Sequence, residues 1–201
     1  IKNKYGALAT PILIELTTFV FKNVRRRSKK ILGEEEGYIY SRLSNPTLTV
    51  AERKSSDIEN GEKALATSSG MGAISATLWT LLKAGDHVLA DKTLYGVTYA
   101  YISHGLTKFG VEVDFVDMSD LEEVKIKLKD NKKEYNLETP ANPNLKIVDI
   151  QKISELSHNK NSNIKVVVDN TFATPFVKSP LLGADIVVHS ATKYLNGHGD
   201  V

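Results

Sequence analysis

The sequence contains no cysteine and few residues of several other informative types. Its 201 residues include 2 methionines, 1 tryptophan and 6 prolines. Without cysteine, the chain can form neither a disulfide nor a thiolate metal site. The histidines are scattered and lack the spacing of metal ligands, so we expect no metal centre; they are His87, His104, His158, His189 and His198.

An excess of one charge and long hydrophobic runs are also lacking. The chain has 26 basic and 24 acidic residues, a formal charge of +2, which gives no global reason to expect binding to nucleic acid or a membrane. No apolar run approaches the roughly 20 residues of a membrane span, and the first residues lack the pattern of a secretory signal. The basic run 22–30 is soon followed by Glu34, Glu35 and Glu36, which is more typical of a solvated helix. We expect a cytoplasmic protein.

Short β-branched runs alternate with longer amphipathic segments from about Glu62 onward. This alternation predicts an α/β fold with a mainly parallel sheet and helices on both faces. The patterns predict strands at 63–68, 87–90, 111–116 and 135–138 and near 164–168 and 184–188, and helices at 47–60, 70–83, 94–109, 120–129 and 147–159. With 41% apolar residues, the chain can bury a sizeable core.

Two of the β-branched runs end in residues that suit one cofactor, pyridoxal 5'-phosphate (PLP). Asp169 follows the first run and Lys193 follows the second. A lysine amine forms a Schiff base with the PLP aldehyde, and a carboxylate facing the ring nitrogen keeps it protonated, so that the ring acts as an electron sink. The neighbouring hydroxyls of Ser190 and Thr192 could bind the phosphate. Taken alone, Asp169 could cap a loop and Lys193 could be a surface lysine; together they favour a PLP site.

The small residues Ser69, Gly70, Met71 and Gly72 lie between a predicted strand and a predicted helix. A helix N-terminus offers free amides and a positive dipole to an anion such as phosphate. A simple tight turn remains an alternative, as does a dinucleotide-binding loop, although the third glycine of that fingerprint would have to stand at Ser75.

Tyr95 begins the next predicted helix, at the edge of the sheet where the carboxyl ends of the strands meet. Its ring could stack on a flat cofactor and its phenol could transfer a proton, or it could simply pack in the core. Tyr40 and Arg42 lie on an exposed, tyrosine-rich arm at 37–46. An arginine fork and a phenol suit phosphate oxygens, but an ordinary interface pair would look the same.

The chain resembles the PLP-dependent enzymes of cysteine and methionine metabolism, the transsulfuration family. The resemblance is carried, in family order, by Gly37-Tyr-Ile-Tyr-Ser-Arg-Leu-Ser-Asn-Pro-Thr47, Ser69-Gly-Met-Gly-Ala73, Ser75-Ala-Thr-Leu-Trp-Thr80, Thr93-Leu-Tyr-Gly96, Glu138-Thr-Pro-Ala-Asn-Pro143, Val168-Asp-Asn-Thr171 and His189-Ser-Ala-Thr-Lys-Tyr-Leu-Asn-Gly-His-Gly-Asp200. It implies the large domain of the aminotransferase fold type I over residues 61–201, preceded by an N-terminal arm and helix over residues 1–60 that makes contacts between subunits.

The resemblance also implies roles for individual residues. Lys193 would be the Schiff-base lysine, Asp169 the partner of the pyridine nitrogen, and Tyr95 the stacking and proton-transferring residue. Ser69, Gly70 and Met71 would bind the phosphate together with Ser190 and Thr192. Tyr40 and Arg42 would reach the phosphate from a neighbouring subunit of a homotetramer built from dimers with shared active sites. Asn142 would lie near the phenolic oxygen of the cofactor.

The implied activity is that of a carbon–sulfur lyase, which converts L-methionine or a related sulfur amino acid to a thiol, 2-oxobutanoate and ammonia. A γ-replacement enzyme acting on an activated homoserine, such as a cystathionine γ-synthase or an O-acetylhomoserine sulfhydrylase, would share every cofactor residue named above. A nucleotide-binding module or a catalytically inactive interaction subunit is the alternative from another class.

Two departures from the family pattern bear on the substrate. Val97 stands where the methionine-cleaving members commonly have a cysteine that lines the active site. Family members are also roughly twice as long, and the resemblance places a smaller domain and the arginine for the substrate carboxylate outside these residues. If the chain ends at Val201, we expect poor catalysis.

Overall fold

The computed structural model describes residues 2–3, 6–7, 13–128, 132–177 and 183–201. The chain forms two compact units, Ile1–Ala66 and Thr67–Val201. Each unit is described by itself below.

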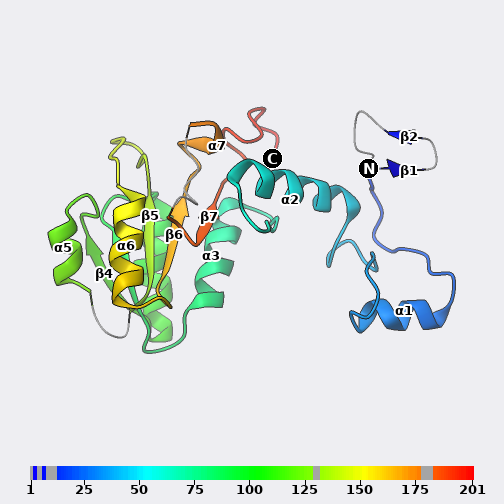
Figure 1. The fold of residues 1–201 in the computed structure, drawn as a ribbon, viewed down its shortest axis with the longest axis horizontal. Helices are drawn as coiled ribbons and strands as arrows, with labels where there is room; N and C mark the ends of the chain where they lie inside the picture. Colours follow the sequence, from blue (N-terminus) through cyan, green and yellow to red (C-terminus); the bar gives the residue numbers. More distant parts are fainter. Residues whose placement is uncertain (1, 4–5, 8–12, 129–131, 178–182) are drawn as a thin grey trace. The chain divides into compact units, whose positions relative to one another are not determined.

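A five-stranded parallel sheet forms the centre of the second unit (Figure 1). Its strands are β3 (His87–Asp91), β4 (Glu112–Val116), β5 (Lys132–Glu138), β6 (Lys165–Asp169) and β7 (Ile186–Val188). They lie in the order β4-β3-β5-β6-β7, and every neighbouring pair is parallel. The predicted parallel α/β fold is therefore confirmed.

Helices cover both faces of this sheet (Figure 1). They are α3 (Gly70–Leu81), α4 (Gly96–Ala100), α5 (Leu121–Ile126) and α6 (Ile150–Lys160), while the short α7 (Thr174–Val177) lies beyond the end of β6. A π-helical turn, Tyr101–Gly105, and a 3-10 turn, Leu106–Phe109, continue α4. The segment predicted as one helix at 94–109 is thus helical almost throughout, but its winding changes twice.

The side chains of each strand alternate between two hydrophobic cores, as the pleat requires. On one face, Leu89 and Val166 pack with residues of α5 and α6, including Val124 and Ile153. On the other face the core includes these residues of the sheet, of α3 and of the α4 segment: Val88, Ala90, Val167, Val188, Ile74, Leu78 and Ile102. Since both faces are covered, the central residues of β3 and β6 and all of β7 form continuous apolar runs.

Side-chain caps fix where three of these helices begin. The Ser69 hydroxyl accepts the N–H of Gly72 at 2.9 Å at the start of α3. Asp120 accepts two amides of the first turn of α5, and Asp149 accepts the amide of Lys152 at the start of α6. Such caps satisfy N–H groups that have no partner within the helix, and they place the loops at the carboxyl edge of the sheet.

The strand predicted at 63–68 is wrong. These residues belong to no strand, and the Leu65 side chain is 80% exposed. The alternation of the sequence fits a strand, but no neighbouring strand forms a ladder with it in the described part of the chain.

The first unit contains the helices α1 (Val24–Ile31) and α2 (Pro46–Glu59) and a short antiparallel pair, β1 (Lys2–Asn3) with β2 (Gly6–Ala7). Asn45 caps α2 through the N–H of Thr47 and also donates to the carbonyl of Ile14 at 3.0 Å. Among the described residues of this unit, no hydrophobic side chain is buried.

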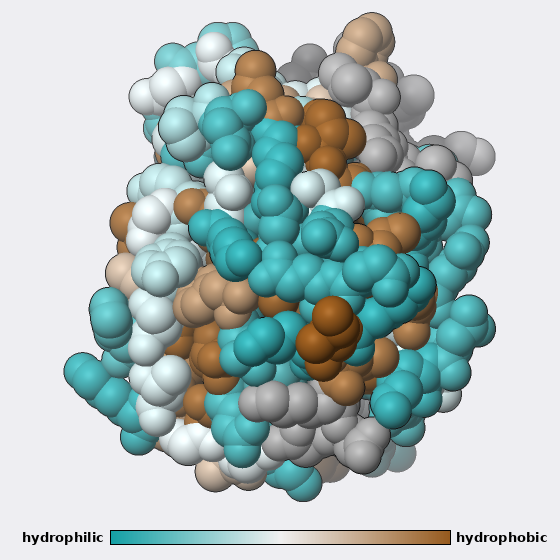
Figure 2. Space-filling model, turned by 90° about the vertical axis from the view of Figure 1, so that its left-hand side faces the viewer, coloured by the Kyte–Doolittle hydropathy of each residue, from teal (hydrophilic) through white to brown (hydrophobic). Residues whose placement is uncertain are grey.

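The end of the second unit at β4 and α5 is mostly hydrophilic. Figure 2 shows this face, on which hydrophobic residues appear as small, separate areas among hydrophilic ones. Scattered apolar residues of this kind are normal for a protein surface. Within the residues that the structure describes, no helix has both the length and the apolar character needed to cross a membrane.

Candidate active site

Four neighbouring strands end in residues that define the candidate site. Asp91 ends β3, Glu138 ends β5, Asp169 ends β6 and Val188 ends β7. Because the strands are parallel, all four residues lie at the same edge of the sheet. From β3 the chain passes to β4 on one side and later to β5 on the other. Ligands of open α/β sheets bind at the carboxyl edge beside such a reversal of strand order.

A series of hydrogen bonds connects Asp169 with Lys193. Asp169 Oδ1 accepts the N–H of Thr171 at 3.0 Å, and the Thr171 hydroxyl accepts the N–H of Ser190 at 2.8 Å. The Lys193 ammonium donates to the Ser190 hydroxyl at 3.3 Å. The predicted acid and amine therefore lie at one locus, joined through Thr171 and Ser190.

The N-terminus of α3 packs directly against Ser190. A Cβ built on Gly70 would lie 2.8 Å from the Ser190 Cβ, which no side chain tolerates. Glycine is required here because two backbones approach each other closely. Gly70 and Met71 belong to the first turn of α3, whose amides have no partner within the helix. The structure thus brings Gly70, at the start of α3, beside Ser190, and the role of Ser69, Gly70 and Met71 at a phosphate stays a prediction.

Glu138 joins the backbones of Tyr95 and Asn142. Its Oε2 accepts the N–H of Tyr95 at 2.8 Å, and its Oε1 accepts the N–H of Asn142 at 3.1 Å. Tyr95 caps α4, and its side chain is 43% exposed, so its ring is available to a ligand. Burial of Glu138, together with the charge of Asp169, raises the pKa of the Glu138 carboxyl from 4.5 to about 7.

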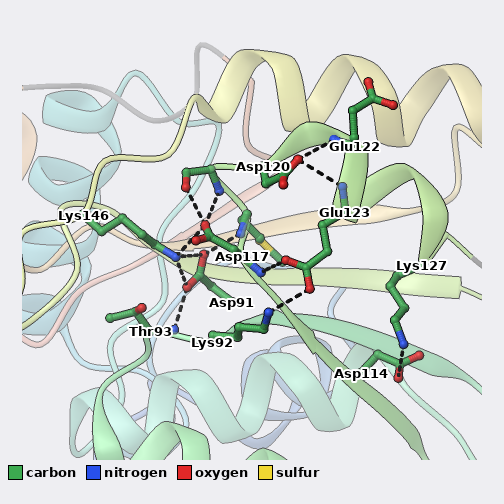
Figure 3. Close-up of polar contacts among 12 residues, drawn as sticks. Asp91, Lys92, Thr93, Asp114, Asp117, Asp120, Glu122, Glu123, Lys127 and Lys146 are labelled. Carbon is green, nitrogen blue, oxygen red and sulfur yellow. Dashed lines mark hydrogen bonds and ion pairs between the residues drawn. The ribbon is translucent and has the colours of Figure 1, made fainter.

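A second buried carboxylate, Asp91, fixes the loops beside the site (Figure 3). Asp91 is fully buried and accepts the N–H groups of Thr93 at 2.6 Å and Met118 at 3.0 Å. The ammonium of Lys146 lies 2.7 Å from Asp91 Oδ1 and 3.1 Å from Asp117 Oδ1. Three loops, those that follow β3, β4 and β5, therefore meet at Asp91.

Asp117, the more exposed carboxylate of this cluster, is held in its charged form. The hydroxyl and amide of Ser119, with a contribution from Lys146, lower the pKa of the Asp117 carboxyl from 3.8 to about 2.

Thr192, Tyr40 and Arg42 are the remaining predicted residues. Thr192 is exposed, one residue before Lys193. Tyr40 and Arg42 lie in the first unit, where the Arg42 guanidinium is 5.2 Å from the centre of the Tyr40 ring. Their role at a phosphate stays a prediction.

The sequence patterns predict no role for Glu138 or Thr171, although both lie in motifs that carry the family resemblance. A signal for Glu138 exists, because it is a carboxylate at the end of a strand, like Asp169. No comparable signal exists for Thr171, whose hydrogen bond to Ser190 crosses from the end of β6 to the end of β7.

The residues present fit PLP. Lys193 supplies an amine, and Asp169, at the end of the next strand, supplies a carboxylate. The exposed ring of Tyr95 can stack on a flat ligand. The first amides of α3, placed against the Ser190 hydroxyl, form a cradle suited to phosphate.

Comparisons with known proteins identify the family of the chain. The family model described as "Cys/Met metabolism PLP-dependent enzyme" matches residues 1–201. An L-methionine gamma-lyase of Fusobacterium nucleatum subsp. polymorphum is 61% identical over all of this chain and 51% of its own length. An L-methionine gamma-lyase of Treponema denticola is 55% identical over all of this chain and 50% of its own length.

A solved structure from Campylobacter jejuni extends the similarity to the fold. It is described as an O-acetylhomoserine (thiol)-lyase with N'-pyridoxyl-lysine-5'-monophosphate. It is 34% identical with a TM-score of 0.91, over 99% of this chain and 49% of its own. The chain spans about half the length of these relatives. With its whole length matched, the chain belongs to the PLP-dependent enzymes of cysteine and methionine metabolism.

Proposed function

We propose that the protein is a PLP-dependent carbon–sulfur lyase that eliminates the thiol from L-methionine or a related sulfur amino acid. The observation that carries this proposal is the series of hydrogen bonds from Asp169 through Thr171 and Ser190 to Lys193. It joins an acid and an amine, the two kinds of group that PLP requires. The similarity to proteins named L-methionine gamma-lyase supports the choice of reaction.

The side chains have complementary roles in this proposal. PLP, when bound, supplies the electron sink for the reaction. Lys193 would hold the cofactor, and its Nζ would move the proton of the substrate α-carbon. The Asp169 carboxylate keeps a proton at the ring nitrogen. The Tyr95 hydroxyl protonates the departing thiolate, so that the leaving group departs as a neutral thiol.

The phosphate has two sets of candidate donors. The first set is the amides of Gly70 and Met71 at the start of α3, with the hydroxyls of Ser69, Ser190 and Thr192. The second set is Tyr40 and Arg42, which we propose to reach the site from a neighbouring subunit. Asn142 is proposed to lie beside the phenolic oxygen of PLP.

We propose a homotetramer built from dimers with shared sites, in which the first unit makes contacts between subunits. Several of its apolar side chains are strongly exposed: Leu13 at 71%, Val20 at 99% and Leu43 at 74%. Apolar surface of this kind is typical of a segment that is covered by another subunit. We accordingly propose that residues 1–60 form contacts between subunits and that residues 61–201 bind the cofactor.

Incubation of the purified, PLP-supplied protein with L-methionine tests the reaction. We expect release of a thiol and 2-oxobutanoate, and a violet absorbance band from PLP bound to lysine. Lys193→Ala should abolish both, whereas Lys108→Ala, which changes an exposed lysine after α4, should leave both intact. A protein that shows the band but yields no thiol or 2-oxobutanoate from methionine would contradict the lyase proposal. A folded protein without the band would favour a nucleotide-binding or catalytically inactive subunit.

Replacement of a γ-substituent is the second candidate reaction. The solved structure with a TM-score of 0.91 is described as an O-acetylhomoserine (thiol)-lyase. Val97, two residues after Tyr95, stands where methionine-cleaving members commonly have a cysteine, and it is 50% exposed. Supplying O-acetylhomoserine with a thiol, in the absence of methionine, separates the two reactions. Formation of a thioether product from that pair, without keto acid, would favour replacement.

A further inference from the structure

Glu138 is a buried carboxylate for which the proposed reaction has no use. Its side chain is only 4% exposed at the end of β5, and within the described part of the chain no ion pair involves it. Burying a charged group without an opposite charge is costly. Both of its oxygens are nevertheless used, because each accepts one backbone N–H.

The two amides that Glu138 binds come from two different loops. Tyr95 lies in the loop from β3 to α4, and Asn142 lies in the loop from β5 to α6. The helices that follow pack on opposite faces of the sheet, because Ile102, in the continuation of α4, packs in one core and Ile153 of α6 packs in the other. The two loops therefore lead to opposite faces of the sheet, and Glu138 joins the start of one loop to the start of the other.

Glu138 also faces the same side of the sheet as Asp169. The two residues are register partners in the parallel pair of β5 and β6, so their side chains point the same way. The preceding residue of each strand, Leu137 or Val168, packs on the face of α6. Glu138 and Asp169 therefore point away from α6, toward the face of α3. This placement explains why the charge of Asp169 is felt at Glu138.

Asp91 holds the same two loops from the opposite face. It alternates with Ala90, which packs on the α3 face, and so points toward α5 and α6. It accepts the amide of Thr93 in the first loop and binds the ammonium of Lys146 in the second. Removal of the Glu138 contacts should therefore leave both loops tethered and the fold intact.

We propose that Glu138 is a positioning residue that sets the backbones of Tyr95 and Asn142 relative to Asp169, an assignment that rests on the proposed function. Glu138 acts through the two amides and does not need to contact the substrate. The Tyr95 amide that Glu138 binds lies at the start of α4, so this contact fixes where the Tyr95 ring lies relative to the site. Asn142 takes its position from the other oxygen of the same carboxylate.

Glu138→Gln is the direct test. The substitution preserves size but replaces one acceptor oxygen with an amide NH₂ group, which faces a backbone N–H and cannot accept from it. Loss of one such hydrogen bond with a donor left unpaired corresponds to about a tenfold change in an equilibrium. We expect PLP to bind about tenfold more weakly, with a smaller visible circular dichroism band of the bound cofactor. We expect kcat to fall more than KM rises.

Asp120→Asn is the matched control. Asp120 also accepts two backbone amides, those of Glu122 and Glu123 at the start of α5, and the same amide chemistry is introduced there. Its visible circular dichroism and PLP affinity should equal those of the unchanged protein. Glu138→Asp is the second variant, because it keeps both acceptor oxygens on a shorter side chain, and its bound-cofactor spectrum should lie between the unchanged protein and Glu138→Gln.

The outcomes separate this proposal from the proposed function. If the unchanged protein binds PLP but does not cleave methionine, the lyase proposal fails, while the visible dichroism still reports on Glu138. A Glu138→Gln variant that binds PLP with the affinity and dichroism of Asp120→Asn would overturn the positioning role. Loss of native far-ultraviolet dichroism in both Glu138 variants would also overturn it, because it would make Glu138 a support of the fold.

Discussion

Replacing Lys146 with methionine should destabilise the second unit by leaving a charge buried without its partner. The Lys146 ammonium lies 2.7 and 2.9 Å from the two oxygens of Asp91, and the Asp91 side chain is fully buried. Methionine keeps an apolar side chain in place of the lysine stem, so the substitution mainly removes the charge. Among the described residues, Asp91 would then retain the N–H groups of Thr93 and Met118 as donors.

The expected loss is about 3 kcal/mol in the free energy of unfolding. Removing one partner of a buried ion pair typically costs about 3–5 kcal/mol. The lower end applies because Asp91 keeps two backbone donors and because Lys146 is 17% exposed, which allows water to approach. Asp117, the other partner of Lys146, has a side chain that is 42% exposed and can be solvated.

Urea denaturation measures this loss. With a slope of about 1–3 kcal/mol per molar urea, the midpoint should fall by about 1–3 M while the slope stays unchanged. Lys125→Met is the control, because Lys125 forms an exposed pair with Glu122 three residues away, and such a pair contributes about 0.5 kcal/mol or less.

Two results would refute this reasoning. The first is a Lys146→Met variant that stays within about 0.5 kcal/mol of the Lys125→Met control at neutral pH, since Asp91 would then not depend on its partner. The second concerns the double variant Asp91→Asn with Lys146→Met, which removes both charges and should recover part of the loss. Strictly additive losses would mean that the two side chains do not interact.

Three further predictions concern other parts of the second unit. Burial and the charge of Asp169 raise the pKa of Glu138 from 4.5 to about 7. Between these pH values the folded state holds a proton that the unfolded state releases, so the free energy of unfolding should fall as pH rises. In cofactor-free Glu138→Gln protein, urea midpoints should show a weaker dependence on pH. Gly70→Ala places a Cβ 2.8 Å from the Ser190 Cβ, and it should weaken PLP binding in an absorbance titration; unchanged affinity would contradict the close approach. Asp120→Ala removes the cap of α5 and should lower the free energy of unfolding by about 1 kcal/mol, without changing the absorbance of bound PLP.

The strand-end positions of the site could be predicted from the sequence because they follow from topology. Runs of β-branched residues identified the strands, and parallel strands present their carboxyl ends at one edge. Asp169 ends β6, and Lys193 follows five residues after the end of β7; their roles at a cofactor stay predictions. The change from an α-helix to a π-helical turn after Ala100 could not be predicted from the sequence, nor could the exposure of Leu65. Both depend on which elements pack against these segments.

The contacts between loops could not be predicted from the sequence. Glu138 binds amides that are 43 and 4 residues away, and Lys146 reaches Asp91 across 55 residues. Such pairs have no periodicity that a sequence could show. A carboxylate at a strand end was nonetheless visible at Glu138, and the same reasoning that selected Asp169 could have selected it.

Because β7 is short, binding of a cofactor beside it would affect the stability of the fold. β7 has three residues and, among the described strands, pairs only with β6, yet the segment that follows it carries Lys193. A ligand held by Asp169 at the end of β6 and by Lys193 after β7 would cross-link the ends of two adjacent strands. By mass action, a molecule that binds only the folded chain stabilises it by RT ln(1 + [L]/Kd). Cofactor supply should therefore control how much of this protein persists in the folded state, and hence its lifetime against proteolysis.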